Sequence, residues 1–341
     1  MRNLFKTSSP TIILILSFLF FVSCKDKDAT PKDTAIDLAL ADSRFSVFTK
    51  LLTDNNLVGS LKTGEPFTIF APTNEAFSKI DVGKFTKTDL VKLLNTHIVR
   101  ERRLLTNEIK SGLVQSPQRI EVYLSKNSSG IFVNAKSKVI SPDITASNGV
   151  IHVVDNVITL PTQNLAEILR KDPQFSEFFS LIELSSTVET SETMLGLPSP
   201  FGGSTILAPT NEAFAELYKI IPKATLLADK QRLKEIIDFH RIGVRRIFSV
   251  DFPDSNQPVN TTLSIFAPIV LSQSASAGFP ITTPAPDITI TGSFKGQYQV
   301  VFDVTDGLKV KGVRSSVANI TSADLLATNG VIHKLDRVLL P

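Results

Sequence analysis

The chain is poor in cysteine and in aromatic side chains that carry a polar group. Its 341 residues include one cysteine, Cys24, three tyrosines and no tryptophan. A single cysteine excludes an intrachain disulfide and a cysteine-based metal cluster. The scarcity of tryptophan and tyrosine weakens a sugar-binding platform of stacked rings, although 23 phenylalanines could line an apolar pocket.

Neither sign of charge is in marked excess. The sequence has 36 basic and 33 acidic residues, for a formal charge of +3. Residues 1–23 hold two of the bases and no acid, so the remainder carries 34 basic and 33 acidic residues, a charge of +1. A nearly neutral protein gives no electrostatic reason to expect a nucleic-acid partner.

Familiar catalytic signatures are missing as well. The sequence has no His-Glu-x-x-His, no Gly-x-Ser-x-Gly, no phosphate-binding Gly-x4-Gly-Lys-Ser/Thr and no acidic calcium loop. Residues 303–307 contain two aspartates and a glycine, but they lie between strand-like segments and are typical of a turn. We therefore expect no enzyme activity, no catalytic or metal-binding residues and no cofactor.

The N-terminus has the pattern of an export signal. Arg2 and Lys6 precede an apolar run at residues 12–22, which is followed by Cys24 and a polar stretch. The run is too short to cross a hydrocarbon core of about 30 Å, which takes roughly 20 helical residues. Residues 21–24 (FVSC) resemble a bacterial lipobox, in which the cysteine becomes the lipidated first residue, although Phe21 stands where that motif usually has leucine.

The sequence thus predicts a lipoprotein signal peptide at residues 1–23, a polar tether at 24–34 and lipid attachment at Cys24. The expected location is the bacterial cell envelope, at the outer membrane, either periplasmic or surface-exposed. The alternative is a cleaved secretory signal followed by a cysteine without a role.

The chain contains one unit twice. Residues 68–77 (TIFAPTNEAF) return as residues 205–214 (TILAPTNEAF), and residues 148–152 (NGVIH) return as 329–333. Both copies keep the two motifs in the same order, which chance similarity of short runs would not produce. We predict two domains, residues 35–161 and 162–341, each long enough to bury its own core.

The second copy is longer, mainly through one insertion. Between the middle histidine and the last motif it exceeds the first copy by 38 residues. The extra length falls at about residues 252–296, the Pro-rich insert, which contains six prolines. Prolines at this density are incompatible with long helices and central strands, so we expect an extended loop or an edge hairpin.

Local patterns indicate a mixture of helices and strands. A strand at residues 67–70 should be followed by a helix capped by Thr73, with Glu75 in its first turn. Apolar residues spaced from Leu90 to His97 predict an amphipathic helix with the histidine at the end of its apolar stripe. Alternation at 120–124 and 131–135 predicts a β-hairpin, and each Asn-Gly pair should feed a closing strand. Each domain is therefore expected to combine helices with a mostly antiparallel sheet.

These motifs resemble the fasciclin (FAS1) family, in two tandem domains. The resemblance covers the Thr-x-Phe-Ala-Pro-Thr-Asn-x-Ala-Phe box and the Asn-Gly-Val-Ile-His box, each present twice. It implies an α+β fold, in which a mostly antiparallel β-wedge or sandwich is flanked by helices, and a use in extracellular adhesion. The family's central Tyr-His pair is only partly kept, as Thr96-His97 and Phe239-His240. The motif residues expected to serve the fold are Thr73, Asn74, His97, Asn148, His152, Thr210, Asn211, His240, Asn329 and His333.

The four histidines allow two interpretations. A catalytic or metal centre would need the two histidines of a domain to meet a carboxylate or a nucleophile. However, His333 alternates in phase with Val331 and Leu335, and His97 and His240 lie on apolar helix faces. We therefore favour buried neutral imidazoles that join the helix to the closing strand.

Two further sets of residues are candidate partner contacts. An Asp-Ile pair that the resemblance ties to receptor binding in animal relatives corresponds to Asp143-Ile144 and Asp324-Leu325. Basic residues follow each middle helix, and they indicate either helix C-terminal charges on a solvated face or a contact to an anion or acidic glycan. The basic candidates are Arg102, Arg103, Arg245 and Arg246.

The sequence thus predicts a non-enzymatic, lipid-anchored adhesion or interaction protein. Its partner would be an extracellular or envelope protein or glycan, and membrane contact would come through the lipid. The alternative is an accessory protein of the envelope that binds a small molecule or a glycan. A hydrolase or other enzyme is the third possibility.

Overall fold

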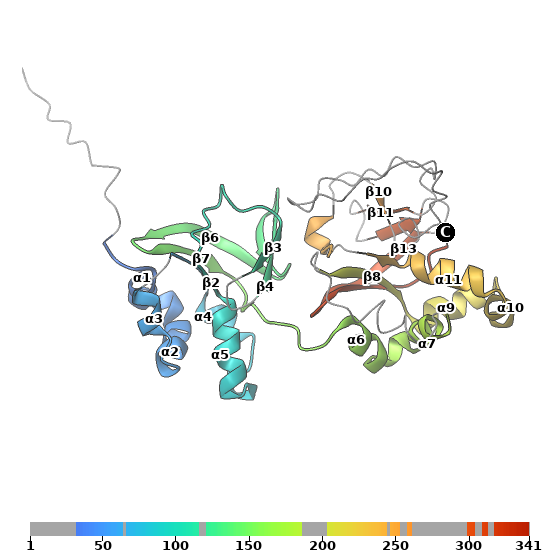
Figure 1. Ribbon diagram of the computed structural model, residues 1–341, viewed down its shortest axis with the longest axis horizontal. Helices are drawn as coiled ribbons and strands as arrows, with labels where there is room; N and C mark the ends of the chain where they lie inside the picture. The colour runs from blue at the N-terminus through green and yellow to red at the C-terminus, as the bar shows by residue number, and fades with distance from the viewer. Residues whose placement is uncertain are drawn as a thin grey trace, which may run out of the picture.

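The structure is a computed structural model of the full chain, shown in Figure 1. It describes residues 32–63, 66–115, 121–185, 203–243, 246–252, 258–260, 299–303, 309–312 and 317–340. The expected signal peptide, Cys24, most of the tether, most of the Pro-rich insert and Arg245 lie outside the described residues. Within the described ranges, no helix combines the length and the apolar character needed to span a bilayer.

Domain 1 comprises the elements from α1 to β7. Its helices are α1 (Ala35–Ala41), η1 (Ser43–Phe45), α2 (Ser46–Asp54), α3 (Val58–Lys62), α4 (Asn74–Ser78), η2 (Val82–Lys84) and α5 (Lys87–Thr96). Its strands are β1 (Phe67–Pro72), β2 (Ile98–Arg100), β3 (Gly112–Gln115), β4 (Glu121–Asn127), β5 (Gly130–Val133), β6 (Ser137–Ala146) and β7 (Gly149–Val154).

Domain 2 comprises the elements from α6 to β14. Its helices are α6 (Leu165–Lys171), η3 (Pro173–Phe175), α7 (Ser176–Ser185), α9 (Asn211–Tyr218), α10 (Lys223–Ala228), α11 (Lys230–Phe239) and η4 (Ser249–Asp251). Its strands are β8 (Ser204–Pro209), β9 (Arg241–Ile242), β10 (Pro258–Asn260), β11 (Gln299–Asp303), β12 (Lys309–Gly312), β13 (Val317–Ala327) and β14 (Gly330–Leu335).

The two sheets have the same topology, as expected for a duplicated unit. Each has seven strands, in the order β2-β1-β7-β6-β5-β4-β3 in domain 1 and β9-β8-β14-β13-β12-β11-β10 in domain 2. The closing strand pairs in parallel with the motif strand in both copies, with Phe67 opposite Gly149 and Ser204 opposite Gly330. The other described pairings are antiparallel. The predicted α+β class with a mostly antiparallel sheet is confirmed.

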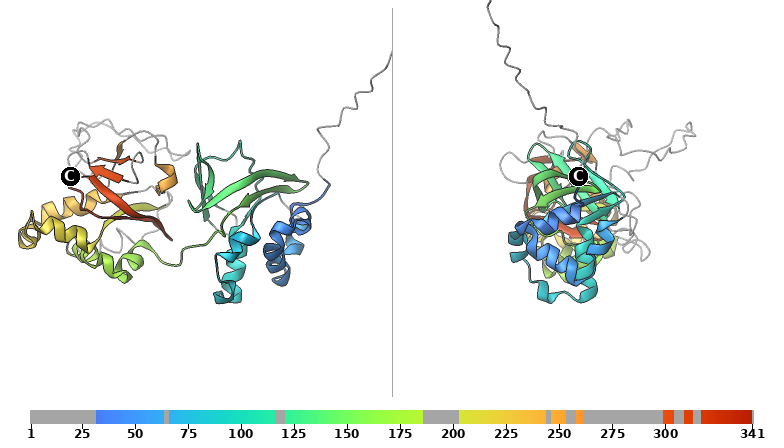
Figure 2. Two further views of the ribbon diagram at one scale, coloured as in Figure 1. Left: turned by 180° about the vertical axis from the view of Figure 1, so that it is seen from behind. Right: turned by 90° about the vertical axis from the view of Figure 1, so that its left-hand side faces the viewer.

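Each sheet separates two apolar layers. Because successive side chains of a strand point to opposite faces, Ile69 and Ile151 of domain 1 pack with helices α1 to α5. Phe70 and Val154 pack on the other side, against Val133 and its neighbours from β3 to β6. Domain 2 divides in the same way, with Ile332 in the helical layer and Leu207 in the other. In each domain the α-helices lie along one side of the sheet, as Figure 1 and the two views of Figure 2 show.

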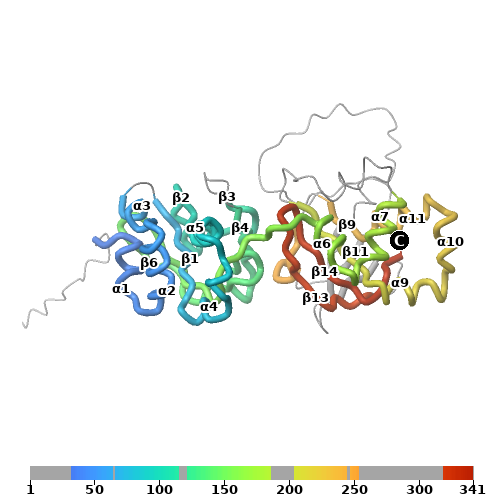
Figure 3. The backbone as a smooth tube through the Cα atoms, turned by 90° about the horizontal axis from the view of Figure 1, so that it is seen from below, coloured from blue at the N-terminus to red at the C-terminus, as the bar shows by residue number. Residues whose placement is uncertain are grey.

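The hairpin expected at residues 120–135 is present as β4 and β5, which pair from Leu124–Val133 to Asn127–Gly130. In the Pro-rich insert, β10 (Pro258–Asn260) is the edge strand of the second sheet and pairs with β11. Proline is tolerated at such an edge because its missing N–H costs no ladder bond there. The segment from β7 to α6 leads from one domain to the next, as the tube in Figure 3 shows.

Candidate functional site

The Thr-Asn pair of the first repeated motif stabilises the helical layer. The hydroxyl of Thr73 accepts a hydrogen bond from the Ala76 N–H at 3.1 Å and so caps α4. Asn74 then accepts from the Val47 N–H at 3.0 Å and donates to the Ser43 carbonyl at 2.9 Å. In domain 2, Thr210 caps α9 and Asn211 bonds Glu177 and Pro173 in the same way. Both side chains of the pair therefore form hydrogen bonds within their own domain.

The Asn-Gly pair of the second motif joins the closing strand to the first helix. Asn148 accepts from the Ala35 N–H at 2.8 Å and donates to the Leu61 carbonyl at 3.0 Å. The following glycine lies so close to β1 that an added Cβ would be 2.3 Å from the Phe67 carbonyl oxygen. In domain 2, Asn329 accepts from the Leu165 N–H, and a Cβ on Gly330 would be 2.3 Å from the Ser204 carbonyl oxygen. The glycine is required for the close parallel pairing of the two strands.

Each middle histidine connects its helix to the segment after the closing strand. His97 is fully buried; its Nδ1–H donates to the Leu93 carbonyl at 2.8 Å, and Nε2 accepts from the Ile158 N–H at 2.9 Å. In domain 2, the Nδ1–H of His240 donates to the Ile236 carbonyl at 2.8 Å, and its Nε2 accepts from the Leu339 N–H at 2.9 Å. Both nitrogens are paired to the backbone, which fixes the Nδ1–H tautomer.

The closing-strand histidines use the opposite tautomer. His152 donates from Nε2 to the Leu104 carbonyl at 2.7 Å, and Nδ1 accepts from the Asp143 N–H at 3.2 Å. In domain 2, His333 donates from Nε2 to the Ile247 carbonyl at 2.8 Å, and its Nδ1 accepts from the Asp324 N–H at 3.4 Å. These imidazoles bridge the closing strand to the loop after the middle helix and to the neighbouring strand.

Burial makes all four imidazoles weak bases. It lowers the pKa of His97 and of His240 from 6.5 to about 4. It also lowers the pKa of His152 and of His333, against the opposing effect of the nearby aspartate in each case. Neutral rings with both nitrogens occupied offer no lone pair to a metal, and within the described ranges no three His, Cys, Asp or Glu side chains gather as a metal site.

The residues that replace the tyrosine of the Tyr-His pair are both buried. The single hydroxyl proton of Thr96 faces two backbone carbonyl oxygens, that of Leu93 at 2.6 Å and that of Ile158 at 3.0 Å. Phe239 is fully buried and packs in the second apolar layer of domain 2. Domain 1 thus keeps a hydroxyl beside its histidine, whereas domain 2 has only apolar contacts there.

The Asp-Ile and Asp-Leu pairs are only partly available to a partner. The Asp143 carboxylate is exposed but accepts from the Thr106 N–H at 2.9 Å, and Ile144 packs against the helical core. Asp324 is 8% exposed and accepts from both the N–H and the hydroxyl of Ser249. Leu325, at 39% exposure, is the more accessible apolar side chain of these four candidates.

The arginine candidates differ between the domains. Arg102 and Arg103 are exposed in domain 1, so they remain available as a basic surface. Arg246 in domain 2 is only 7% exposed and donates to the Thr328 carbonyl at 3.3 Å. Both pairs of arginines follow the middle histidine at the same spacing and therefore led to the same prediction, but Arg103 and Arg246 are packed differently.

Sequence reasoning missed a buried carboxylate on the middle helix of domain 2. Asp238 is 3% exposed and forms an ion pair with Lys234 one helical turn before it. The nearby Arg241 has its pKa lowered by burial, with Asp238 acting in the opposite direction. The spacing of Lys234 and Asp238 indicates an i,i+4 pair, but only the folded domain shows that Asp238 is buried while Lys234 stays exposed.

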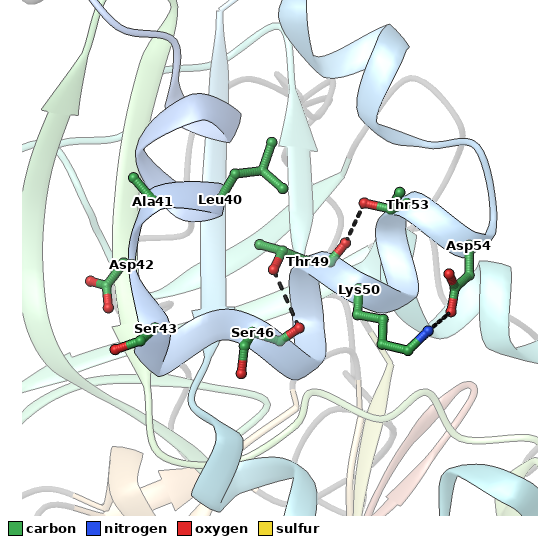
Figure 4. Close-up of a pocket in the computed structure, with 9 residues that line it drawn as sticks. All are labelled: Leu40, Ala41, Asp42, Ser43, Ser46, Thr49, Lys50, Thr53 and Asp54. Carbon is green, nitrogen blue, oxygen red and sulfur yellow. Dashed lines mark hydrogen bonds and ion pairs between the residues drawn. The ribbon is translucent and has the colours of Figure 1, made fainter.

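Two open depressions lie on the described surface. One, of about 440 Å³, lies at the corner of α1 and α2 and is lined by Leu40, Asp42 and Lys50 among others, as Figure 4 shows. The other, of about 480 Å³, lies beside the interdomain segment and includes Leu160, Lys171 and Leu325. Neither brings together histidine, carboxylate and nucleophile in the way a hydrolytic site requires.

The sequence was compared with models of known protein families and with known proteins. The sequence model of the Fasciclin domain matches residues 43–161 and 173–341. Transforming growth factor-beta-induced protein ig-h3 of Sus scrofa is 27% identical over 309 residues, which are 87% of this chain and 38% of that protein. Periostin of Homo sapiens is 26% identical over 320 residues, 93% of this chain and 32% of that protein. This chain therefore spans between about a third and two fifths of these two relatives.

The comparisons also match a protein from Synechocystis sp. and a solved domain pair. Protein sll1483 of Synechocystis sp. is 36% identical over 135 residues, 38% of this chain and 74% of that protein. A FAS1 domain pair from the insect cell adhesion molecule Fasciclin I aligns with 88% of this chain and 97% of its own, at 17% identity and a TM-score of 0.39. Since the family model covers most of the chain in two segments, the chain belongs to the fasciclin domain family.

Proposed function

We propose that this chain is a non-enzymatic adhesion or interaction protein, held at the cell envelope by a lipid on Cys24. The observation that carries the proposal is the use of the motif residues: in both domains the Thr, Asn and His side chains bond the backbone of their own domain. Within the described ranges, the side chains of these repeated positions serve the fold of their own domain. Recognition then depends on the outer surface and the loops.

The two domains act in series in this proposal. If each contacts a target, the second contact is intramolecular and raises the overall avidity without any new kind of interaction. The partner is an extracellular or envelope protein or glycan. Among the described candidate contacts, Arg102, Arg103 and Asp143 of domain 1 and Leu325 of domain 2 are exposed.

The adhesive role can be tested with beads that carry the fragment starting at Lys32. We expect such beads to adhere to cells or envelope vesicles of the source organism more strongly than beads that carry an unrelated protein of similar charge. Pretreating the target with a protease or with glycosidases distinguishes a protein partner from a glycan partner. Equal adhesion of both kinds of bead would contradict the proposal.

The Pro-rich insert offers a variant that leaves the sheet in place. Asn260 and Gln299 are opposite each other in the β10–β11 ladder, so residues 261–298 can be replaced by a two-residue Asn-Gly hairpin turn. We propose that the insert supplies specific contacts, and we expect the replaced chain to keep its melting temperature and to adhere less. Adhesion equal to that of the intact chain would rule out this role.

Lipid anchoring requires a separate test. Cells expressing the full chain are labelled with a fatty acid and fractionated, and the Cys24→Ser chain is the matched control because no other cysteine exists. We expect label and membrane retention in the first and neither in the second. Membrane release of both chains would favour the alternative, a cleaved signal followed by an idle cysteine.

A further inference from the structure

The two domains meet in a small cluster of side chains drawn from both. The ring of Tyr123 on β4 of domain 1 lies 5.1 Å from the ring of Phe248, which directly precedes η4 of domain 2. Figure 1 shows η4, in orange, on the side of domain 2 that faces β4. We call the apolar set the junction cluster; its members are Ala135 and Tyr123 of domain 1 and Phe248, Val250, Leu326 and Val331 of domain 2.

Phe248 is fully buried, although it stands in an irregular segment at the edge of its domain. Tyr123 and Ala135 of domain 1 pack against it, so the hairpin of the other domain contributes to its burial. Aromatic pairs at this ring separation attract each other beyond the effect of area burial alone.

Polar contacts accompany the apolar ones. The side-chain amide of Asn127, at the end of β4, donates to the Val250 carbonyl at 2.5 Å. The buried guanidinium of Arg246 feels the charge of Glu121 on β4, which opposes the lowering of the arginine pKa by burial. The two interactions connect the β4–β5 hairpin of domain 1 with η4 of domain 2 and with the loop that precedes it.

Domain 1 itself provides an internal comparison. Leu104 and Ile247 accept the same histidine hydrogen bond, so Arg103 and Leu105 correspond to Arg246 and Phe248. Arg103 is exposed and Leu105 is half-buried, because no hairpin of another domain contacts them within the described ranges. These two positions are therefore buried in the second copy, where they face the neighbouring domain, and more exposed in the first.

We propose that the face of the β4–β5 hairpin that carries Tyr123 docks against Arg246, Phe248 and Val331 of domain 2, and that this docking joins the tandem into one rigid body. A target that contacts both domains then meets two surfaces at a fixed spacing. Preset spacing removes the orientational freedom that a flexible linker would otherwise lose on binding.

Engineered cysteines test the docking in the full chain. In a Cys24→Ser background no other thiol is present, so Asn127→Cys and Val250→Cys form a defined pair. We expect it to oxidise to an intrachain disulfide at least tenfold faster than the control pair Asn127→Cys and Lys219→Cys, whose second residue follows α9. Equal rates for the two pairs, or a disulfide that links two chains, would overturn the proposal.

Hydrogen exchange provides the second test, with no crosslink. Tyr123→Ala on domain 1 should accelerate amide exchange in residues 246–252 of domain 2 by about fivefold, the change that loss of such a ring pair produces. Phe132→Ala is the matched control, because this aromatic residue lies on the same hairpin outside the junction cluster.

Asn127→Asp is a milder variant in case Tyr123→Ala unfolds domain 1. It keeps the acceptor that receives the Ser129 N–H at 2.8 Å in the hairpin turn but loses the donor to Val250. It should also accelerate exchange in residues 246–252. Exchange in this segment that stays unchanged in folded Tyr123→Ala and Asn127→Asp chains would show that the domains do not dock.

Discussion

The Nε2 atom of His97 accepts a hydrogen bond from the backbone N–H of Ile158, which lies 61 positions further along the chain. His240 and Leu339 form the same bond in the second copy across 99 positions. In each domain one imidazole thus joins the C-terminal end of the middle helix to the segment that follows the closing strand.

Replacing His97 with alanine should strongly destabilise domain 1. The change leaves a cavity and removes the partners of one buried N–H and one buried carbonyl, for an expected loss of about 3 kcal/mol in the free energy of unfolding. Urea unfolding of the chain measures it. Lys92→Ala, at an exposed position of the same helix, is the control and should change stability little. Equal stability of the two variants would contradict the folding role of the histidine.

Stability should fall on mild acidification. Because burial lowers the pKa of His97 and of His240 to about 4, the unfolded chain binds more protons than the folded chain between pH 4 and 6.5. Their contribution is fully present above pH 6.5 and is lost as the pH falls towards 4, by about 3 kcal/mol for each histidine. Thermal unfolding across this range measures the dependence of stability on pH, and His97→Gln should remove the part of it that His97 contributes. A melting temperature independent of pH from 7 to 4.5 would contradict this account.

The glycine of each Asn-Gly pair should not tolerate a methyl group. In Gly149→Ala the new Cβ would be 2.3 Å from the Phe67 carbonyl oxygen, so β1 and β7 must separate, with an expected loss of about 2 to 3 kcal/mol. Gly59→Ala in α3 is the matched control, because a Cβ there has no atom within 4 Å, and alanine should stabilise the helix by about 0.5 kcal/mol. Thermal unfolding of the two variants should shift in opposite directions; a shift in the same direction would be evidence against the close pairing.

Thr73→Ala should remove the cap of α4. The Ala76 N–H would lose its acceptor, which costs about 1 kcal/mol at a helix N-terminus. Thr73→Ser keeps the hydroxyl and should restore most of the stability. Chemical denaturation compares the three chains, and a serine variant as unstable as the alanine variant would show that packing of the methyl group, not capping, is the main effect.

The local elements could be predicted from the sequence because their signals are short-ranged. The cap at Thr73 and the apolar stripe that ends at His97 depend on residues within one or two turns. The β4–β5 hairpin follows from alternation on both sides of one turn. The duplication helped further, since a pattern present twice is more reliable than one present once.

The partners of these residues could not be predicted in the same way. Nothing in the sequence near His97 indicates Ile158, and nothing near Gly149 indicates that its neighbour is the Phe67 carbonyl. Both depend on the parallel pairing of strands that are about 80 residues apart, which only the complete sheet defines. Arg246 shows the same limit: its position matches that of Arg103, but contacts with another domain determine its burial.

The parallel pairing of β7 with β1 also determines when each domain can fold. Strand β1 is made early, but its parallel neighbour is the last strand of the domain, and the histidine bond to Ile158 comes later still. Contacts between such distant segments are slow to form, because a long loop must close first. During synthesis domain 1 therefore cannot reach its final state until residue 158 has left the ribosome, and domain 2 has to wait for residue 339.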